Sequence, residues 1–315
     1  MSALSFEARS FEARSFGLGL QSNKRPGAYA ALARQAEADG FDVVTVFNDL
    51  FFQPALPALL EIAQATERVR VGPACLNPFT LHPVEIAGQA AALDLASGGR
   101  SYLGLAAGAW LDRIALDSAR SLTAIAETWE IVSRLLARDD SGFDGELYSL
   151  AAGNMLAYEP LRPSVPLLVG TWSPRLTAFA AEHADEVKIG GSANPAMVRL
   201  MKERLGDSDT QLVVGAVTVV DQDDARAREH ARREVALYLP VVAGYDPTVE
   251  LSEGGEITDD LLDRFAFAGE PARIVEHARS LFEAGADRIE FGTPHGIDER
   301  RGVELLGSRV LPQFL

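Results

Sequence analysis

The sequence predicts an α/β fold, specifically a (β/α)8 barrel of the TIM type with insertions. Three observations predict it. Apolar runs that suit strands alternate with helical segments, eight such runs fit within the 315 residues, and no Pro- or Ser-rich linker divides them. Alternating β and α units imply a parallel sheet, and barrels of this length are routinely one domain. An open Rossmann-like sheet is the alternative, but no G-x-G-x-x-G motif follows the first strand.

The predicted strands are short apolar or β-branched runs, and the predicted helices have start or stop signals. Gly40 ends the first helix, and Pro83 and the pair Gly98-Gly99 bracket the third. The strands lie at 16–20, 41–47, 69–74, 101–106, 167–170, 186–189, 211–219 and 288–291. The helices lie at 28–39, 57–67, 83–96, 118–137, 174–183, 195–205, 225–239 and 271–284.

Three segments interrupt this alternation. The pentapeptide Ser-Phe-Glu-Ala-Arg occurs at 5–9 and again at 10–14, and two copies this short cannot form a solenoid. We interpret residues 1–14 as an N-terminal extension and residues 15–315 as a single barrel domain. The polar, turn-rich stretch 139–163 predicts a hairpin or insertion, and 244–258 is a second irregular stretch.

Composition excludes several classes of function. The net charge of −16 argues against nucleic acid and anionic membranes as partners, although helix N-termini could still bind an anionic cofactor. Cys75 is the single cysteine, so no intrachain disulfide or cysteine-based zinc cluster can form, and no metal site is expected. With no apolar stretch long enough to span a bilayer and no secretory signal, we expect a cytoplasmic protein.

The active site of such a barrel lies on the loops that follow the strands. Asp49 and His295 are the candidate catalytic groups there, and the other positions are mostly small or aromatic. Hydrolase motifs such as G-x-S-x-G and H-E-x-x-H do not occur. A site poor in acids and nucleophiles but rich in Gly and Trp indicates a bound cofactor that carries the chemistry.

Two loops are candidates for binding a phosphate group. Gly170-Thr171-Trp172-Ser173 leads into a helix that begins at Pro174, where free amides favour an anion. Gly190-Gly191 on the next loop would let the backbone approach the same phosphate. Ordinary caps and turns are the alternative interpretation of both loops.

Further residues carry a resemblance to a known family. The run Val71 to Pro83, the segments 91–94, 97–100 and 103–105, and the turn Gly269-Glu270-Pro271 resemble the bacterial luciferase-like superfamily. Within it, they are similar to the F420-dependent methylenetetrahydromethanopterin reductases and their bacterial relatives. The resemblance extends over about residues 15–315, and the 71–105 block is its most specific part.

The resemblance implies a homodimer that holds coenzyme F420, or alternatively FMN, at the carboxyl ends of the strands. It implies a cis peptide bond at Ala74–Cys75 that supports the planar ring of the cofactor, and an acidic residue, Asp49, near its reactive edge. Leu50 stands where many relatives have His. The implied cofactor-binding residues are Ala74, Cys75, Asn77, Gly108, Gly170, Thr171, Ser173, Gly190 and Gly191, and Trp110 and Trp172 are candidates for stacking on the substrate or cofactor.

The resemblance therefore implies hydride transfer between F420 and a small organic substrate, a pterin-like or other unsaturated carbon or imine compound. An FMN-dependent luciferase-like monooxygenase is the first alternative, and a cofactor-binding barrel without catalysis is the second. Several residues have structural alternatives: Ala74 and Cys75 as barrel lining, Asn77 as a turn residue before Pro78, and Asp49 as a loop cap.

Overall fold

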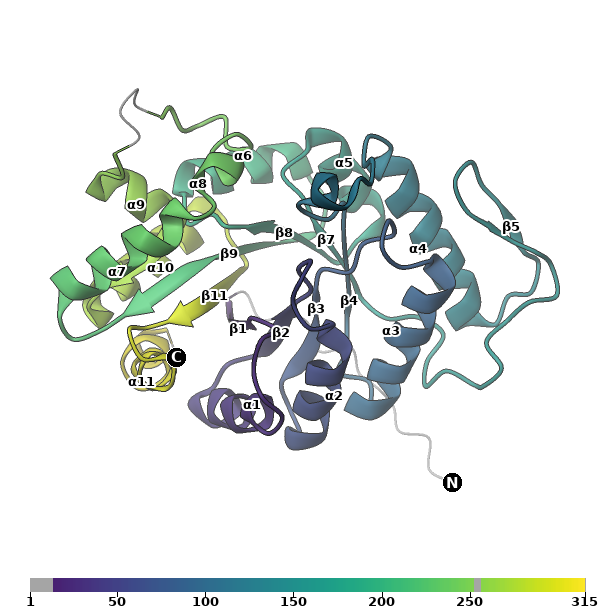
Figure 1. The fold of residues 1–315 in the computed structure, drawn as a ribbon, viewed down its shortest axis with the longest axis horizontal. Coiled ribbons are helices and arrows are strands. Elements are labelled where there is room, and N and C mark those ends of the chain that lie inside the picture. Colours follow the sequence, from purple (N-terminus) through teal and green to yellow (C-terminus); the bar gives the residue numbers. More distant parts are fainter. Residues whose placement is uncertain (1–13, 252–255, 315) are drawn as a thin grey trace.

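Eight parallel strands form the wall of a barrel in the computed structural model, which describes residues 14–251 and 256–314 (Figure 1). They are hydrogen-bonded in the order β3-β2-β1-β11-β9-β8-β7-β4, and isolated parallel bridges at Val71–Ser101 and Leu76–Leu105 bring β3 and β4 together. The predicted (β/α)8 barrel is confirmed. The strands are β1 Ser15–Leu20, β2 Val43–Phe47, β3 Arg70–Ala74, β4 Leu103–Ala106, β7 Leu167–Gly170, β8 Glu186–Gly190, β9 Gln211–Val220 and β11 Arg288–His295.

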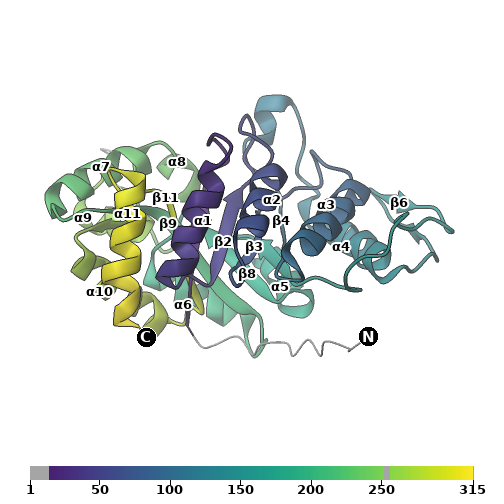
Figure 2. The same ribbon diagram turned by 90° about the horizontal axis from the view of Figure 1, so that it is seen from below.

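Helices cover the outside of this wall (Figure 2). Pro residues begin four of them at positions 83, 174, 195 and 271, and left-handed glycines at 40, 98 and 285 end three, as their conformational preferences dictate. The predicted bounds 28–39, 174–183, 195–205 and 271–284 coincide with the structure. The main helices are α1 Ala28–Asp39, α2 Ala55–Ala65, α3 Pro83–Ser97, α4 Ser121–Ala137, α5 Pro174–His183, α6 Pro195–Leu205, α7 Asp224–Ala236, α10 Pro271–Ala284 and α11 Glu299–Leu305.

The segment between β9 and β11 is more elaborate than predicted. It contains the short helices α8 Leu239–Val242 and α9 Asp259–Phe265 and the strand β10 Ala266–Gly269, which pairs in parallel with the second half of β9. Helices of four to seven residues carry too little periodicity to be recognised in the sequence, and β10 was not predicted either. The helix 271–284 precedes the last barrel strand, as its predicted bounds required, and α11 is an unpredicted helix that follows that strand.

The stretch 139–163 contains the predicted hairpin. Its strands β5 Phe143–Asp144 and β6 Ser149–Leu150 pair antiparallel, and the hairpin projects beyond α4, away from the barrel (Figures 1 and 2). The short helix η1 Leu111–Ile114 lies in the loop before α4. The tandem repeat lies outside the described residues, except for its last residue, Arg14. Within the described residues no helix is long and apolar enough to cross a membrane.

Candidate active site

The predicted site residues come together at one face of the barrel. Asp49 follows β2, Cys75 follows β3, Gly108 follows β4, Thr171 follows β7 and Gly191 follows β8. Because parallel strands in a barrel end on the same face, these loops lie together at one end of the barrel, which we call the mouth. The arrangement matches the usual position of an active site in this architecture.

The peptide bond between Ala74 and Cys75 is cis, as the resemblance implied. The Cys75 thiol points into the barrel, because a Cβ atom built on Gly170 or Gly104 would lie 3.0 or 3.3 Å from its Sγ. Burial raises the pKa of the thiol to about 12. Cys75 is therefore a neutral, small side chain at neutral pH and not a nucleophile.

Asp49 is the half-buried carboxyl group at the mouth. Burial raises its pKa and outweighs two opposing effects, a 3.2 Å hydrogen bond donated by Gln21 Nε2 and the positive charge of Lys188. A carboxyl with a raised pKa takes up a proton more readily near neutral pH than an exposed one does. Asp49 can thus act as a proton donor or acceptor.

A buried ion pair lies below the mouth, and the sequence interpretation missed it. The Lys188 ammonium contacts the Glu290 carboxylate, which also accepts a 2.8 Å hydrogen bond from Thr45 Oγ1. The Tyr102 hydroxyl completes the network, 2.8 Å from Thr45 Oγ1 and 3.2 Å from the Gly72 carbonyl oxygen, to which it donates. These groups fill the barrel interior with hydrogen-bonded polar atoms.

A second charged cluster lies towards the amino ends of the strands. Glu186 Oε1 accepts from Arg288 Nη1 at 2.6 Å and from Arg70 Nη1 at 2.9 Å. Both the ion pair and this second cluster could have been recognised from the spacing of charged residues within the buried strands. Positions 186 and 188 in β8, and 288 and 290 in β11, are two apart and so share the inward face.

His295 does not face the mouth. Its side chain is 0% exposed, and its Nε2 lies 3.0 Å from the carbonyl oxygen of Gly19. Its Nδ1 lies 3.6 Å from Glu299, which also pairs with Lys24 at 2.6 Å. The predicted strand end at 291 is too early, because β11 continues through a register shift to His295. We therefore leave His295 out of the proposed catalytic groups.

Asn77 is engaged in a turn. It is 4% exposed, and its Oδ1 accepts from the backbone amides of Phe79 and Thr80 at 3.2 and 3.0 Å. Its side chain packs under Gly108, whose φ of +83° is a conformation that favours glycine. The turn-forming interpretation of Asn77 fits these contacts, and the residue shapes the loop that carries Gly108.

The two candidate phosphate-binding loops differ in which hydrogen-bond donors are free to bind a phosphate group. The amides of Gly191 and Ser192 both donate to the Gly215 carbonyl oxygen, at 2.6 and 3.1 Å, so they are not free for a phosphate. On the other loop, the Thr171 hydroxyl accepts from the Ser173 amide at 2.9 Å, while the Ser173 side chain makes no cap hydrogen bond. The start of α5 is thus the better of the two candidates.

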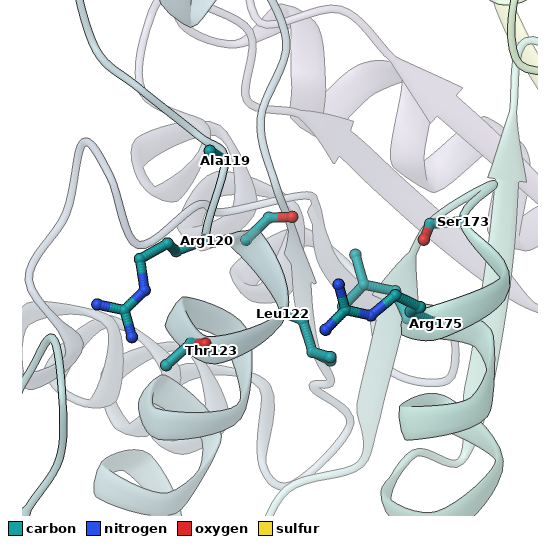
Figure 3. Close-up of a pocket in the computed structure, with 8 residues that line it drawn as sticks. Ala119, Arg120, Leu122, Thr123, Ser173 and Arg175 are labelled. Carbon is teal, nitrogen blue, oxygen red and sulfur yellow. The ribbon is translucent and has the colours of Figure 1, made fainter.

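A cleft of about 270 Å³ lies between the first turns of α4 and α5 (Figure 3). Arg120 and Arg175 line it, and the Arg175 side chain extends from α5 towards Leu122 (Figure 3). Arg120 also pairs with Glu146 on the hairpin side. Two guanidinium groups beside hydroxyls suit an anionic ligand. The hydroxyl groups that line the cleft belong to Ser121, Thr123 and Ser173.

The two tryptophans lie on different loops of the mouth. Trp110, at the start of η1, is half-buried, and the Arg113 guanidinium lies 5.5 Å from its ring centroid. The ring centroid of Trp172 is 6.4 Å from that of Tyr245. The backbone carbonyl oxygen of Trp172 accepts a hydrogen bond from Arg204 Nη1 at 2.9 Å. Both rings are partly accessible, as stacking on a ligand would require.

Comparisons with known proteins agree with this arrangement. The chain is 29% identical to a 5,10-methylenetetrahydromethanopterin reductase of Archaeoglobus fulgidus over 89% of its length and 93% of that protein. It is 27% identical to an F420-dependent glucose-6-phosphate dehydrogenase of Beutenbergia cavernae, covering 91% and 92% of the two chains.

Among solved structures, the fold is similar to the coenzyme F420-dependent tetrahydromethanopterin reductase of Methanopyrus kandleri. The TM-score is 0.86 at 24% identity, covering 96% of this chain and 99% of that one. The model of the luciferase-like monooxygenase family matches residues 11–288. The chain belongs to the luciferase-like monooxygenase family.

Proposed function

We propose that the protein is an oxidoreductase that transfers hydride between bound coenzyme F420 and a small organic substrate. The observation that carries the proposal is the mouth itself, where accessible small residues end several strands beside one ionisable group, Asp49. A Cβ atom built on Gly190 would meet nothing within 4 Å, so there is open space at this strand end. The relatives that use F420, by their names, support this choice of cofactor.

The residues present fit such a cofactor. The surface formed by Ala74, Cys75 and Gly108 would support a planar ring, because none of these residues has a bulky side chain. The cleft at Arg120, Ser173 and Arg175 would hold the phosphate and the carboxylates of the tail. When bound, F420 supplies the hydride at C5 of its deazaflavin ring.

The chain's own residues orient the substrate and move a proton. Asp49 donates or accepts a proton at its carboxyl oxygen, and its raised pKa makes protonation easier than in an exposed carboxyl group. Trp110 and Trp172 stack on the substrate or cofactor and exclude water. We expect a pterin-like or similarly unsaturated substrate, a single barrel domain over residues 15–315, and a cytoplasmic homodimer, on the strength of the family resemblance.

Equilibrium binding of F420 and FMN to the purified protein tests the assignment. We expect at least tenfold tighter binding of F420, followed by oxidation of reduced F420 with one member of a panel of pterin, sugar-phosphate and carbonyl substrates. Tenfold tighter binding of FMN, with oxygen consumption, would instead support the monooxygenase, a description that the family model carries. Binding of either cofactor without turnover would indicate a barrel that lacks catalysis.

A further inference from the structure

The ion pair of Lys188 and Glu290 has no part in the function proposed above, yet it is almost fully buried. The two residues are 5% and 1% exposed. Removing two charges from water costs several kcal/mol for each ion, which their attraction offsets only when the geometry is good. An apolar pair would fill the same space without that cost. A buried charge pair this close to the mouth therefore requires an explanation.

The pair joins the two strands that flank β9 in the barrel wall. Lys188 is on β8, Glu290 is on β11, and Thr45 on β2 donates to Glu290 at 2.8 Å. The Lys188 Nζ lies 5.4 Å from the ring centroid of Phe47. Phe47 is the last residue of β2, two positions before Asp49. The ammonium group is thus held, by two contacts, beneath the loop that carries the proposed catalytic carboxyl.

Few groups act electrostatically on Asp49. From the end of β1, the neutral Gln21 donates to its Oδ2 at 3.2 Å. From the start of the loop after β3 comes the Cys75 thiol, which stays neutral. From β8, the charge of Lys188 opposes the effect of burial on the Asp49 pKa, and Glu290 on β11 pairs with that charge. Among these groups, Lys188 is the one that carries a positive charge.

We propose that Lys188, held in place by Glu290 and Thr45, is a positioning residue that stabilises the carboxylate form of Asp49 at the mouth of the barrel. Without this cation, a half-buried Asp49 would remain protonated to higher pH, so a smaller fraction of it would be the carboxylate that accepts a proton. Glu290 limits the effect by cancelling part of the field of Lys188. The catalytic part of this inference rests on the proposed function, whereas the electrostatic part concerns the ligand-free protein alone.

Titration of Asp49 by carbon-13 NMR in the ligand-free protein tests the proposal, with Asp49→Asn identifying its signal. Lys188→Met should raise the pKa of Asp49 by about one unit, because a nearby opposite charge is lost. Glu290→Gln should lower it, because the positive charge of Lys188 then acts on Asp49 without a neighbouring negative charge to offset it. Lys188→Arg keeps the positive charge and should reproduce the wild-type value.

Arg70→Met is the control, because it removes one partly buried cation from the same barrel at the opposite end of the strands. It should move the pKa of Asp49 by less than about a third of the Lys188→Met shift, since Coulomb interactions weaken with distance. An unchanged pKa in Lys188→Met, or equal shifts in Lys188→Met and Arg70→Met, would overturn the proposal.

If Lys188→Met does not fold, Glu290→Gln and Lys188→Arg test the proposal. In that case Glu290→Gln must lower the pKa of Asp49 while Lys188→Arg leaves it in place, and any other pair of results rejects the inference. Failure of F420 to bind would remove the proposed function but would leave this titration intact. The two failures are therefore distinguishable.

Discussion

At the residue scale, Asp49 combines three properties that suit proton transfer: a place at the mouth, partial burial and a raised pKa. A positioned acid or base contributes roughly 10²–10⁴ in rate. We therefore expect Asp49→Asn to lower kcat by about a hundredfold and to change the dissociation constant of F420 by less than about threefold. Steady-state kinetics and cofactor titration measure the two effects. Asp221→Asn is the control, because Asp221 also follows a barrel strand but caps its own loop.

Glu299 gives a prediction about stability and pH. Burial raises its pKa, but contacts with His295 and the Lys24 ammonium outweigh this and lower the pKa from 4.5 to about 2. A carboxyl whose pKa is lower in the folded state stabilises the fold above its unfolded pKa, and this stabilisation is lost as the pH falls towards the folded pKa. Glu299→Gln should therefore lower the free energy of unfolding at pH 7 by about 1–2 kcal/mol, and the loss should shrink as the pH falls from 4.5 towards 2.

Urea denaturation at neutral and acidic pH measures this difference. Glu304→Gln is the control, since Glu304 pairs with Arg301 at the surface and should contribute less than about 0.5 kcal/mol. A Glu299→Gln effect that is the same at both pH values would mean that the carboxylate charge does not stabilise the fold.

The sequence was a good guide to which residues end the strands, because strand ends follow from local patterns. Asp49, Cys75, Gly108 and Thr171 were found in this way. Charges two positions apart in the buried strands indicate inward-facing charged residues, but the pairing of Lys188 with Glu290 was missed because it joins residues 102 apart in the chain. His295 was predicted to follow the last strand, but β11 continues through a register shift that the sequence does not reveal and ends at His295, which is fully buried.

At the element scale, the hairpin of β5 and β6 depends on one carboxylate from α4. Glu127 accepts from the amides of Glu146, Leu147 and Tyr148, at 2.6, 2.9 and 2.9 Å. Glu127→Ala leaves three donors without their acceptor, and hydrogen bonds to a charged group contribute about 1.5–3 kcal/mol each. We expect amide hydrogen exchange to accelerate at 146–148 while the exchange of barrel-strand amides is unchanged.

A matched change at Glu130 controls for the loss of charge, because Glu130 lies on the same helix and contacts Arg134 at the surface. Glu130→Ala should leave the hairpin amides protected. If Glu127→Ala also accelerates exchange throughout the strands, the hairpin is part of the cooperative core and not an attached unit.

The helices show which secondary-structure elements can be predicted from the sequence. Those flanked by Pro and Gly, such as α5 and α1, were predicted with their bounds, because these residues fix the backbone at the helix ends. The elements α8, α9 and β10 were not predicted. They are stabilised by contacts with β9 and α7 instead of by their own periodicity, as the parallel pairing of β10 with β9 illustrates.

At the scale of the whole molecule, closure of the barrel did not follow strictly from the sequence. Eight βα units are also compatible with an open sheet, and only the structure shows β3 and β4 joined through the bridges at Val71–Ser101 and Leu76–Leu105. The packing of side chains on the inward face of these two strands permits this closure. Tyr102 packs against Gly72, where a Cβ atom would lie 2.5 Å from its ring, so a larger residue there would force the two strands apart.

The net charge of −16 raises a further question for the whole molecule, namely how it would bind a polyanionic cofactor. Long-range repulsion must be overcome by cations placed locally, and the cleft between α4 and α5 places Arg120 and Arg175 together.

Arg175→Ala should weaken F420 binding by about tenfold, the equivalent of roughly 1.4 kcal/mol for one charge-assisted contact. Because that contact is screened by salt, the variant should also lose affinity less steeply than wild type as ionic strength rises. Fluorescence titration at several salt concentrations measures both quantities, with Arg279→Ala on α10 as the control, since Arg279 pairs with Glu276 outside this cleft. Equal affinities in the two variants would place the anionic groups of the cofactor elsewhere on the mouth.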